Sequence, residues 1–509
     1  MTLNFAKITD STSRPSPVVT WLHPHLRSIK MLRRTKIVAT LGPATVDPEI
    51  LGALIRAGAD VVRLNLSHGS HADHRTMAGN VRRLAEQAGR SVGILVDLQG
   101  PKIRIGSFRE GPIHLKYDDT FIIDGDCPPN GGNQERVGLT FPDLTDDLAP
   151  EDILVLNDGA IVLKVYKIVG KQIHCRVKTG GTLSNNKGIN KLGGGLSAPA
   201  LTDKDREDIK FAATIDADYL AVSFVQNAND VHEAGELLKE AGGHGGIVAK
   251  IERAEAMNCI EEIIEASQAI MIARGDLGVE IGDAELPAVQ KRLIKQARAM
   301  NKVVITATQM MESMINNPIP TRAEVFDVAN AVIDGTDAVM LSAESAAGKY
   351  PVEAVQAMDR ICREAEKQDV VRESSHRLDT LFGRIDESIA MATMYTANHL
   401  GVAAIAALTE SGSTPKWMSC INSSIPIIAI TPHDATKGKV TLFRGVYPVD
   451  IDTTGLNGLD GDKKILTELQ KRLIIKGGDT VIITRGDRNY ISGGTNTMKI
   501  LTADDQPSS

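Results

Sequence analysis

Short apolar runs alternate with amphipathic helical stretches along most of the chain from Lys36 onward. The runs are nearly continuous in Val, Ile, Leu and Ala, which is typical of parallel strands that are covered on both faces. Eight of them occur in strand–helix order: KIVATLG, VVRLNLSH, VGILVDL, DYLAVSFV, GIVAKIE, AIMIARGD, VVITATQ and AVMLSAE. Eight such units over about 250 residues predict a (β/α)8 barrel whose active site lies at the carboxyl ends of the strands. A doubly wound open sheet is the alternative, but it would divide the polar strand ends between two edges.

Two regions depart from this alternation. Residues 102–197 form short, turn-punctuated and partly alternating runs, which predict a small all-β domain inserted after the third strand, where it could cover the site as a lid. After a polar stretch, the runs AAIAAL, IPIIAITP and DTVIITRG predict a C-terminal α/β domain with a mostly parallel sheet. The expected division is an N-terminal extension (1–31), the barrel (32–101 and 198–370), the lid (102–197) and the C-terminal domain (371–505).

Composition narrows the class of protein. A chain of 509 residues is too long for one ordinary hydrophobic core, and a net charge of -7 argues against a dedicated nucleic-acid surface. No apolar run reaches the roughly 20 residues of a membrane helix. The five cysteines are scattered without metal-ligand spacing, which favours reduced thiols in a cytoplasm. The first thirty residues contain three prolines and no clear amphipathic pattern, and they are expected to be disordered.

Two consecutive strand ends carry charge. The run IVAKIE leaves Lys250 and Glu252 at its end, and AIMIARGD leaves Arg274 and Asp276. Charged groups at the ends of buried strands are costly unless a partner, a metal or an anion neutralises them. Glu252 and Asp276 could share a hard divalent cation, Mg²⁺ or Mn²⁺, with Lys250 facing the transferring group. The structural alternative is that these residues only stabilise the fold. Lys250 would then form an ion pair with Asp276, and Arg274 would form one with Glu252.

Further polar residues follow other strands at the same predicted rim. Those with a candidate role are Arg63, Asn65 and Ser67 in VRLNLSHG, Asp97, Lys102 and Arg104 in LVDLQGPKIRIG, Gly275 in ARGDLG, and Thr308 in TATQMMESM. Arg63 would point into the barrel and needs an anion there. Gly275 permits close backbone approach, and the following turn could aim N–H groups at a carboxylate. A hydroxyl such as that of Thr308 is more often part of the core than a proton carrier.

Together these segments resemble the pyruvate kinase family. The resemblance covers residues Arg33 to Leu501 and rests on RRTKIVATLGPAT, RLNLSHG, DLQGPKIRIG, AKIE, MIARGDLGVE, TATQMMESM and GGTNTMKI, in that order. It implies the barrel, the lid and the C-terminal domain, and phosphoryl transfer from phosphoenolpyruvate to ADP, which gives ATP and pyruvate. It also implies a homotetramer.

The resemblance assigns roles to individual residues. Lys250 would stabilise the transferring phosphoryl group, Arg63 would clamp the phosphate, and the Gly275 and Asp276 amides would hold the substrate carboxylate. Thr308 would help to position the proton donor for the enolate, through water. The nucleotide contacts would be Pro43, His68, Arg104 and Lys187, the last reaching from the lid.

One position departs from the family pattern. Much of the family carries an acidic residue where this chain has Lys102, and it uses K⁺ near the positions of Asn65, Ser67 and Asp97. The Lys102 ammonium could supply that charge in place of the ion. The sequence therefore predicts activity without a monovalent cation.

The C-terminal domain carries the segment TESGST after an apolar run. A Ser/Thr/Gly turn at a strand end that opens a helix can hold phosphate, although it is equally a helix cap and turn. In pyruvate kinases it resembles the pocket of an allosteric activator, with residues Arg485 to Gly494 as its other wall. The candidate residues are Thr409, Ser411, Gly412, Ser413 and Thr414. Many relatives have Arg or Lys where Ser413 stands, so the expected effector is a phosphomonoester.

Two other functions fit some of these features. A magnesium-dependent barrel lyase or aldolase acting on a pyruvate enolate could use the same carboxylates and cation, but would not need a nucleotide-facing lid. A regulator that senses metabolites without catalysis would leave the paired strand-end charges as an unexplained cost.

Overall fold

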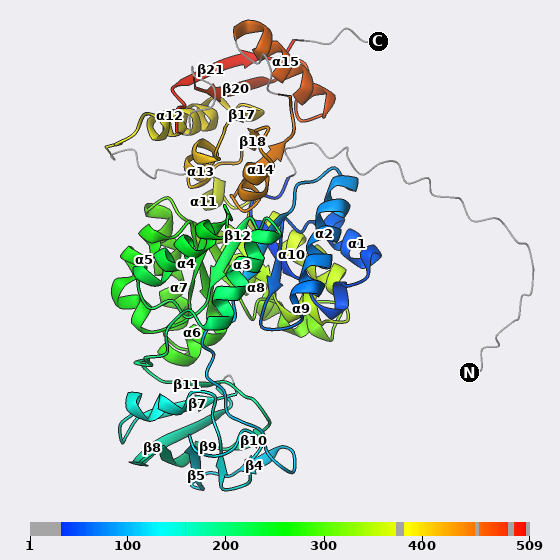
Figure 1. Ribbon diagram of the computed structural model, residues 1–509. Helices are drawn as coiled ribbons and strands as arrows, with labels where there is room; N and C mark the ends of the chain where they lie inside the picture. The colour runs from blue at the N-terminus through cyan, green and yellow to red at the C-terminus, as the bar shows by residue number, and fades with distance from the viewer. Residues whose placement is uncertain (1–31, 158, 373–380, 453–457, 487–492, 505–509) are drawn as a thin grey trace, which may run out of the picture.

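The computed structural model describes residues 32–157, 159–372, 381–452, 458–486 and 493–504. A barrel lies in the middle, an all-β lid at one end and an α/β domain at the other (Figure 1). This arrangement confirms the predicted fold class. The expected N-terminal extension, and most of the polar stretch before the C-terminal domain, lie outside the described residues.

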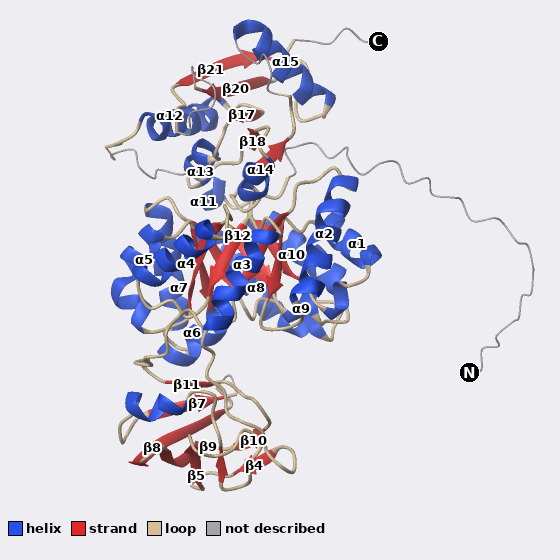
Figure 2. Cartoon of the chain, in the orientation of Figure 1, coloured by secondary structure: helices blue, strands red, loops and turns tan. Residues whose placement is uncertain are grey.

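The barrel is a closed parallel sheet surrounded by helices (Figure 2). Its strands are β1 (Lys36–Thr40), β2 (Val61–Asn65), β3 (Gly93–Asp97), β12 (Tyr219–Val222), β13 (Gly246–Ile251), β14 (Ala269–Ala273), β15 (Val303–Ala307) and β16 (Ala338–Leu341). The helices are α1 (Pro48–Ala57), α2 (His71–Gln87), α3 (Asp203–Thr214), α4 (Ala228–Glu240), α5 (Ile260–Ala266), α6 (Arg274–Ile281), α7 (Leu286–Ala299), α8 (Arg322–Asp334), α9 (Ala343–Ala346) and α10 (Pro351–Ala365).

All eight predicted runs contain a barrel strand, and each strand ends before its run does. The run AIMIARGD stops being a strand at Ala273, and Arg274 begins α6. Asp276 therefore lies in the first turn of a helix, where a negative charge is favourable.

Side-chain acceptors at the amino-terminal end of the barrel follow a repeating rule. The residue just before each of β2, β12, β14 and β16 accepts a hydrogen bond from the second backbone N–H of the preceding barrel strand. The four bonds are Ile37 to Asp60 (2.9 Å), Ile94 to Asp218 (2.7 Å), Ile247 to Gln268 (2.6 Å) and Val304 to Asp337 (2.9 Å). Each bond satisfies an amide that the parallel ladder leaves open at its end.

The lid consists of β4 (Ile113–Leu115), β5 (Thr120–Asp124), β6 (Arg136–Val137), β7 (Ile153–Leu156), β8 (Ile161–Val169), β9 (Gln172–Thr179), β10 (Gly181–Leu183) and β11 (Ile189–Lys191). Six of these strands form one sheet in the order β11-β7-β8-β9-β5-β6, and β10 pairs with β4. The lid has its own core, with Phe121, Leu163 and Ile173 fully buried. It faces the carboxyl ends of the barrel strands (Figure 1).

The C-terminal sheet has the order β19-β18-β17-β20-β21. Its strands are β17 (Ala404–Leu408), β18 (Ile427–Ile430), β19 (Val446–Val449), β20 (Thr480–Arg485) and the antiparallel β21 (Thr497–Thr502); the helices are α11 (Asp369–Arg372), α12 (Ile385–Leu400), α13 (Ser413–Ser419), α14 (Asp434–Val440) and α15 (Gly458–Lys471). This domain docks on the amino-terminal end of the barrel, where the Tyr219 hydroxyl donates to the Lys439 carbonyl (2.5 Å) and the Lys36 ammonium to the Val446 carbonyl (2.6 Å).

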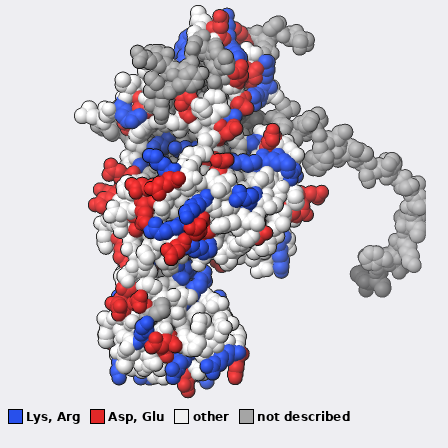
Figure 3. Space-filling model, viewed as in Figure 1, with Lys and Arg blue, Asp and Glu red and all other residues white. Residues whose placement is uncertain are grey.

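Surface charge is mixed. On the face shown in Figure 3, basic and acidic side chains are interspersed over the barrel and the C-terminal domain. No helix in the described part of the chain has both the length and the apolar character to cross a membrane.

The repeated hydrogen bonds at the amino-terminal end of the barrel predict a measurable loss of stability when one acceptor is removed. Gln268→Leu should lower the free energy of unfolding by about 1–2 kcal/mol, because the N–H of the buried Ile247 loses its acceptor. Urea unfolding followed by circular dichroism measures the change. Gln268→Glu keeps an acceptor and serves as the control; equal stability of the two variants would contradict the rule.

Candidate functional site

The predicted charged residues meet at the barrel end that faces the lid. They come from the ends of β2, β3 and β13 and from the first turn of α6. Lys250, Asp97 and Glu252 are all buried there. The arrangement differs from both ion pairs of the structural alternative.

Lys250 lies at the centre of the cluster. Its Nζ is 2.9 Å from Glu252 Oε1 and 3.3 Å from Asp97 Oδ1, and it donates to Ser223 Oγ at 2.7 Å. Burial alone would lower the pKa of Lys250, but Asp97 and then Glu252 raise it above its ordinary value. The side chain is therefore a fixed ammonium. The Ser223 contact was missed in the sequence, although this hydroxyl also follows the end of a strand run, in DYLAVSFV.

Asp97 is shared by two cations. Its Oδ2 is 2.6 Å from Arg63 Nε, while Oδ1 faces Lys250. Burial by itself would raise the pKa of Asp97, but Lys250 and Arg63 hold it below its ordinary value. Arg63 also donates to the Thr40 hydroxyl at 3.1 Å. The anion that Arg63 requires in the barrel is thus Asp97, which fixes the spacing of the two cationic groups.

Glu252 and Asp276 are two carboxylates that pair with different cations, Glu252 with Lys250 and Asp276 with Lys102. Glu252 Oε2 accepts from the Phe224 N–H at 2.8 Å. Burial, opposed by Lys250, raises the pKa of Glu252, and the negative charge of Asp276 adds to the rise. Two oxygen-donor groups that repel each other fit a hard divalent cation. Within the described residues no group of three or more His, Cys, Asp or Glu side chains is arranged to hold a metal ion, so such a cation would complete its shell with water and substrate oxygens.

The chain enters the lid through the segment at Lys102, the entering arm. From there the Lys102 side chain reaches this pair. Its Nζ is 2.9 Å from Asp276 Oδ1. The Asn65 side chain accepts from the Ser67 N–H at 3.2 Å in a local turn, and the Asp97 carboxylate is held by Arg63 and Lys250. The ammonium of Lys102 thus neutralises a predicted metal ligand, whereas the sequence had associated it with Asn65, Ser67 and Asp97.

Thr308 supports the first turn of α6. Its Oγ1 accepts from the Gly275 N–H at 2.8 Å and donates to the Ala307 carbonyl at 2.7 Å. The amide expected to hold a substrate carboxylate is therefore bonded to Thr308, and this hydroxyl would have to rotate to release it. Arg274 does not pair with Glu252; it donates to the Thr308 carbonyl (2.7 Å) and forms an ion pair with Asp327 (2.8 Å).

Three non-glycine residues at this rim have a left-handed backbone conformation. Phe224, Thr308 and Gln309 have φ angles of 56°, 65° and 53°. Non-glycine residues adopt this left-handed region rarely, and a β-branched residue such as Thr308 does so at a cost. The bonds from Phe224 to Glu252 and from Arg274 to Thr308 hold these conformations. Propensity along the sequence gives no signal for them.

Two of the four predicted nucleotide residues lie on the barrel rim, and two lie on the segments that join barrel and lid. Pro43 and His68 are exposed on the barrel rim. Arg104 and Lys187 belong to the two paired arms that join barrel and lid: Arg104 bridges to Gly188, and the Lys187 carbonyl accepts from the Ile105 N–H at 2.9 Å.

The predicted effector residues follow β17. Gly412 has a φ of 79°, and its N–H donates to Thr409 Oγ1 at 2.9 Å. The Ser413 hydroxyl donates to Asp386 (3.1 Å), and those of Thr414 and Thr495 are 2.6 Å apart. Residues 487–492, which form most of the expected second wall, lie outside the described residues.

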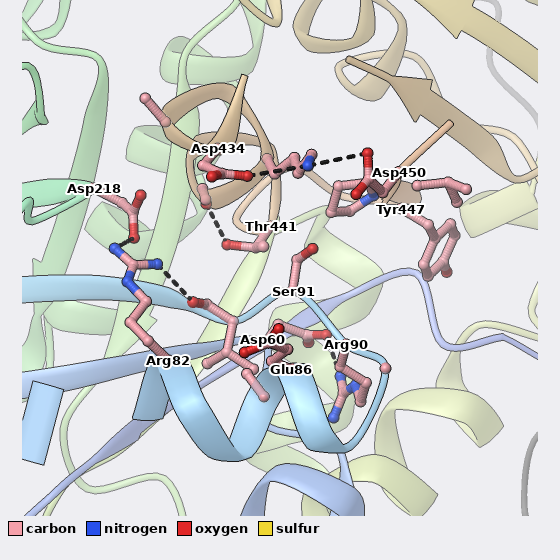
Figure 4. A pocket seen from close by; sticks show the side chains of 18 of the residues that line it. Asp60, Arg82, Glu86, Arg90, Ser91, Asp218, Asp434, Thr441, Tyr447 and Asp450 are labelled. Atoms are coloured by element: carbon pink, nitrogen blue, oxygen red, sulfur yellow. Dashed lines mark hydrogen bonds and ion pairs between the residues drawn. The ribbon is translucent and has the colours of Figure 1, made fainter. Parts of the chain in front are cut away.

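A cavity of about 1210 Å³ lies at the opposite end of the barrel, against the C-terminal domain (Figure 4). Its charges are largely paired: Arg82 with Asp218 (2.9 Å), and Lys437 with Asp434 (3.0 Å) and Asp450 (3.2 Å). None of the predicted site residues lines it. The lid-facing rim is therefore the better candidate for chemistry.

Comparison with known proteins identifies the family of the chain. Residues 32–355 match the family described as pyruvate kinase, barrel domain, and residues 387–501 match pyruvate kinase, alpha/beta domain. The chain is 53% identical to pyruvate kinase II of Salmonella typhimurium, over 93% of this chain and all of that protein. It is 51% identical to a pyruvate kinase of Haemophilus influenzae, over 93% and 99%, and 42% identical to one of Geobacillus stearothermophilus, over 93% and 81%. The chain belongs to the pyruvate kinase family.

Proposed function

We propose that the lid-facing rim carries out phosphoryl transfer from phosphoenolpyruvate to ADP, with Lys250 as its central cation. The observation that carries the assignment is the buried ammonium of Lys250, which lies 3.3 Å from Asp97 and 2.9 Å from Glu252. Both reactants are highly anionic, so positioning and charge compensation dominate the barrier.

The binding roles follow from the charges. Arg63 clamps the phosphate of phosphoenolpyruvate, and Lys250 stabilises the transferring phosphoryl group and the developing enolate. Mg²⁺ or Mn²⁺ held by Glu252 and Asp276 would supply positive charge to the carboxylate and phosphate oxygens. The Gly275 and Asp276 amides bind the carboxylate, and Thr308 helps to position the proton donor for the enolate, through water.

The nucleotide would lie between the rim and the lid. Pro43 and His68 contact it from the barrel, and Arg104 and Lys187 from the two arms. Closure of the lid would exclude water that could otherwise hydrolyse the phosphate.

Replacing Lys250 tests the central assignment. Lys250→Met should lower kcat by about three orders of magnitude or more, while binding of phosphoenolpyruvate persists, because the lost charge acts mainly in the transition state. A coupled assay with ADP and phosphoenolpyruvate gives kcat, and calorimetry gives binding. Lys210→Met, on the exposed face of α3, is the matched control. Unchanged turnover in Lys250→Met would exclude the assignment.

We also propose that catalysis needs no K⁺. The support is the positive charge of Lys102, 2.9 Å from Asp276, together with the neutralisation of Asp97 by Arg63 and Lys250. A further monovalent cation would then have no uncompensated carboxylate to bind.

The requirement for K⁺ is measured by replacing the ion with tetramethylammonium. The wild-type rate should change by less than about twofold, whereas Lys102→Glu should lose about tenfold and regain activity with K⁺, because a fixed charge has been reversed beside Asp276. Lys116→Glu makes the same charge change on the exposed surface of the lid. A large loss in the wild type would contradict the proposal.

A phosphomonoester, such as a sugar monophosphate or AMP, is the proposed allosteric activator, bound at Thr409, Ser411, Gly412, Ser413 and Thr414. The turn at Gly412 supports a phosphate site. Ser413 brings no positive charge, and Arg384 is paired with Asp386 at 2.9 Å beside it. One phosphate group is therefore easier to neutralise here than two.

Titration at sub-saturating phosphoenolpyruvate tests this effector site. Sugar monophosphates and AMP should raise the rate more than a sugar bisphosphate, and Ser413→Asp should abolish the response, because a second carboxylate beside Asp386 repels phosphate. Absence of a response to every compound would mean that the segment is only a turn.

A homotetramer is the proposed assembly. Phe326 and Ile333, seven residues apart on α8, and nearby Ile319 are exposed by 70%, 37% and 69%. Apolar side chains gathered on one surface favour a subunit interface. Light scattering measures the mass; a single-chain mass would contradict this assembly.

A further inference from the structure

Both chain crossings between barrel and lid are attached to α6. The entering arm is attached through Lys102, whose Nζ is 2.9 Å from Asp276 Oδ1 in the first turn of the helix. The leaving arm is attached at the other end, where the Gly193 N–H donates to the Glu280 carbonyl at 2.8 Å. The lid therefore has two fixed points on one short helix.

The side chain of Glu280 extends this connection to the segment that follows Glu252. Only 3% of Glu280 is exposed. Its Oε2 accepts from the Ala254 N–H at 2.8 Å, and its Oε1 accepts from Asn190 Nδ2, in lid strand β11, at 3.4 Å. Ala254 follows Glu252 by two residues, and Asp276 precedes Glu280 by one helical turn. A single carboxylate thus joins the lid to both chain segments that carry the predicted metal ligands.

The leaving arm is held at two further points by the same segment. Gly195 donates its N–H to Glu255 Oε1, and Arg253 donates to the carbonyls of Leu196 (2.8 Å) and Ala198 (3.1 Å). Gly193, Gly194 and Gly195 have φ angles of 88°, 78° and 89°. A Cβ atom at Gly194 would lie 2.6 Å from the Glu255 carboxylate. Only glycine permits the arm to approach Glu255 so closely.

We propose that Glu280 is a positioning residue that couples the position of the lid to the geometry of the metal-binding carboxylates Glu252 and Asp276. The coupling rests on the proposed metal role of those two residues. Movement of β11 displaces the Glu280 carboxylate, which shifts both α6 and the segment at Ala254. A lid displaced from this position would separate the two ligands, and a bound divalent cation would in turn favour the position in which they converge.

The electrostatic environment of Glu280 is consistent with this role. Burial, opposed by the Ala254 N–H, raises the pKa of Glu280 to about 7, and Glu255 adds to the rise while Arg253 lowers it. An ionised carboxylate accepts at both oxygens, whereas a protonated one uses one oxygen as a donor. Since the Ala254 amide and the Asn190 side chain both donate, the three-way connection is complete only in the ionised state.

The test removes one acceptor and then restores the pairing. Glu280→Gln presents an NH₂ group to either Ala254 or Asn190, both of which are donors. The double variant Glu280→Gln with Asn190→Asp reverses the polarity of one hydrogen bond and re-forms it. Glu285→Gln, an exposed position just before α7, is the matched control.

Two measurements on the full chain without substrate read out the coupling. Hydrogen exchange of peptides covering 189–198 and 253–257 should become about tenfold faster in Glu280→Gln, as expected for one lost hydrogen bond. Mn²⁺ affinity, from the paramagnetic resonance of the free ion, should fall about three- to tenfold. The double variant should recover both, and the control should change neither.

Different outcomes separate this inference from the proposed function. Faster exchange with unchanged Mn²⁺ affinity would make Glu280 a structural contact only and overturn the coupling, as would unchanged exchange. Asp276→Asn supplies the independent check on the metal site. If it bound Mn²⁺ as tightly as the wild type, the metal assignment would fail, whatever the exchange of Glu280→Gln showed.

Discussion

The lid-facing rim is organised around one buried carboxylate, Asp97, which lies between Lys250 and Arg63. Its two oxygens face one cation each, at 3.3 and 2.6 Å. It compensates both charges where they are largely buried, because an unpaired ammonium or guanidinium is costly to hold away from water. Asp97 therefore sets the distance between the two groups that would meet the phosphate and the transferring phosphoryl. Removing it would take a counter-ion from both cations, and not merely one bond.

The carboxylates at the two ends of the barrel have different partners. At the amino-terminal end Asp60, Asp218 and Asp337 accept hydrogen bonds from strand amides, and Asp60 and Asp218 also pair with Arg33 and Arg82. At the lid-facing end Asp97, Glu252 and Asp276 meet side-chain cations that a ligand can displace or share. The hydrogen bonds to strand amides complete the barrel sheet beside the C-terminal domain. The ion pairs at the lid-facing end leave a site whose charges can be rearranged. This difference also explains why the large interdomain cavity, although lined by many charged groups, is a weaker candidate for chemistry.

Sequence reasoning predicted the members of the site better than their partners. The barrel and the rim positions of Lys250, Glu252 and Asp276 follow from strand runs that end in charge. The partners depend on long-range geometry: Lys102 reaches Asp276 across 174 residues, and Arg274 turns to Asp327 because a helix starts where the strand seemed to continue. The strained conformation of Thr308 and the role of Ser223 likewise leave no pattern that a period of 2 or 3.6 residues can reveal. The contact between the leaving arm and Glu280 likewise leaves no such pattern in the sequence.

Charge balance links the side chains of the site to the proposed reaction. Arg63, Lys250 and Lys102 oppose Asp97, Glu252 and Asp276, so these side chains are neutral as a set. A divalent cation adds two positive charges and fully ionised phosphoenolpyruvate adds three negative ones, which leaves the loaded site close to neutral as well. The cation would also take Asp276 from Lys102, and the ammonium thus released lies on the arm that enters the lid. Loading the metal would therefore change the attachment of the lid to α6 at Lys102, whereas the hydrogen bonds of Glu280 to Gly193 and Asn190 do not involve the carboxylate of Asp276.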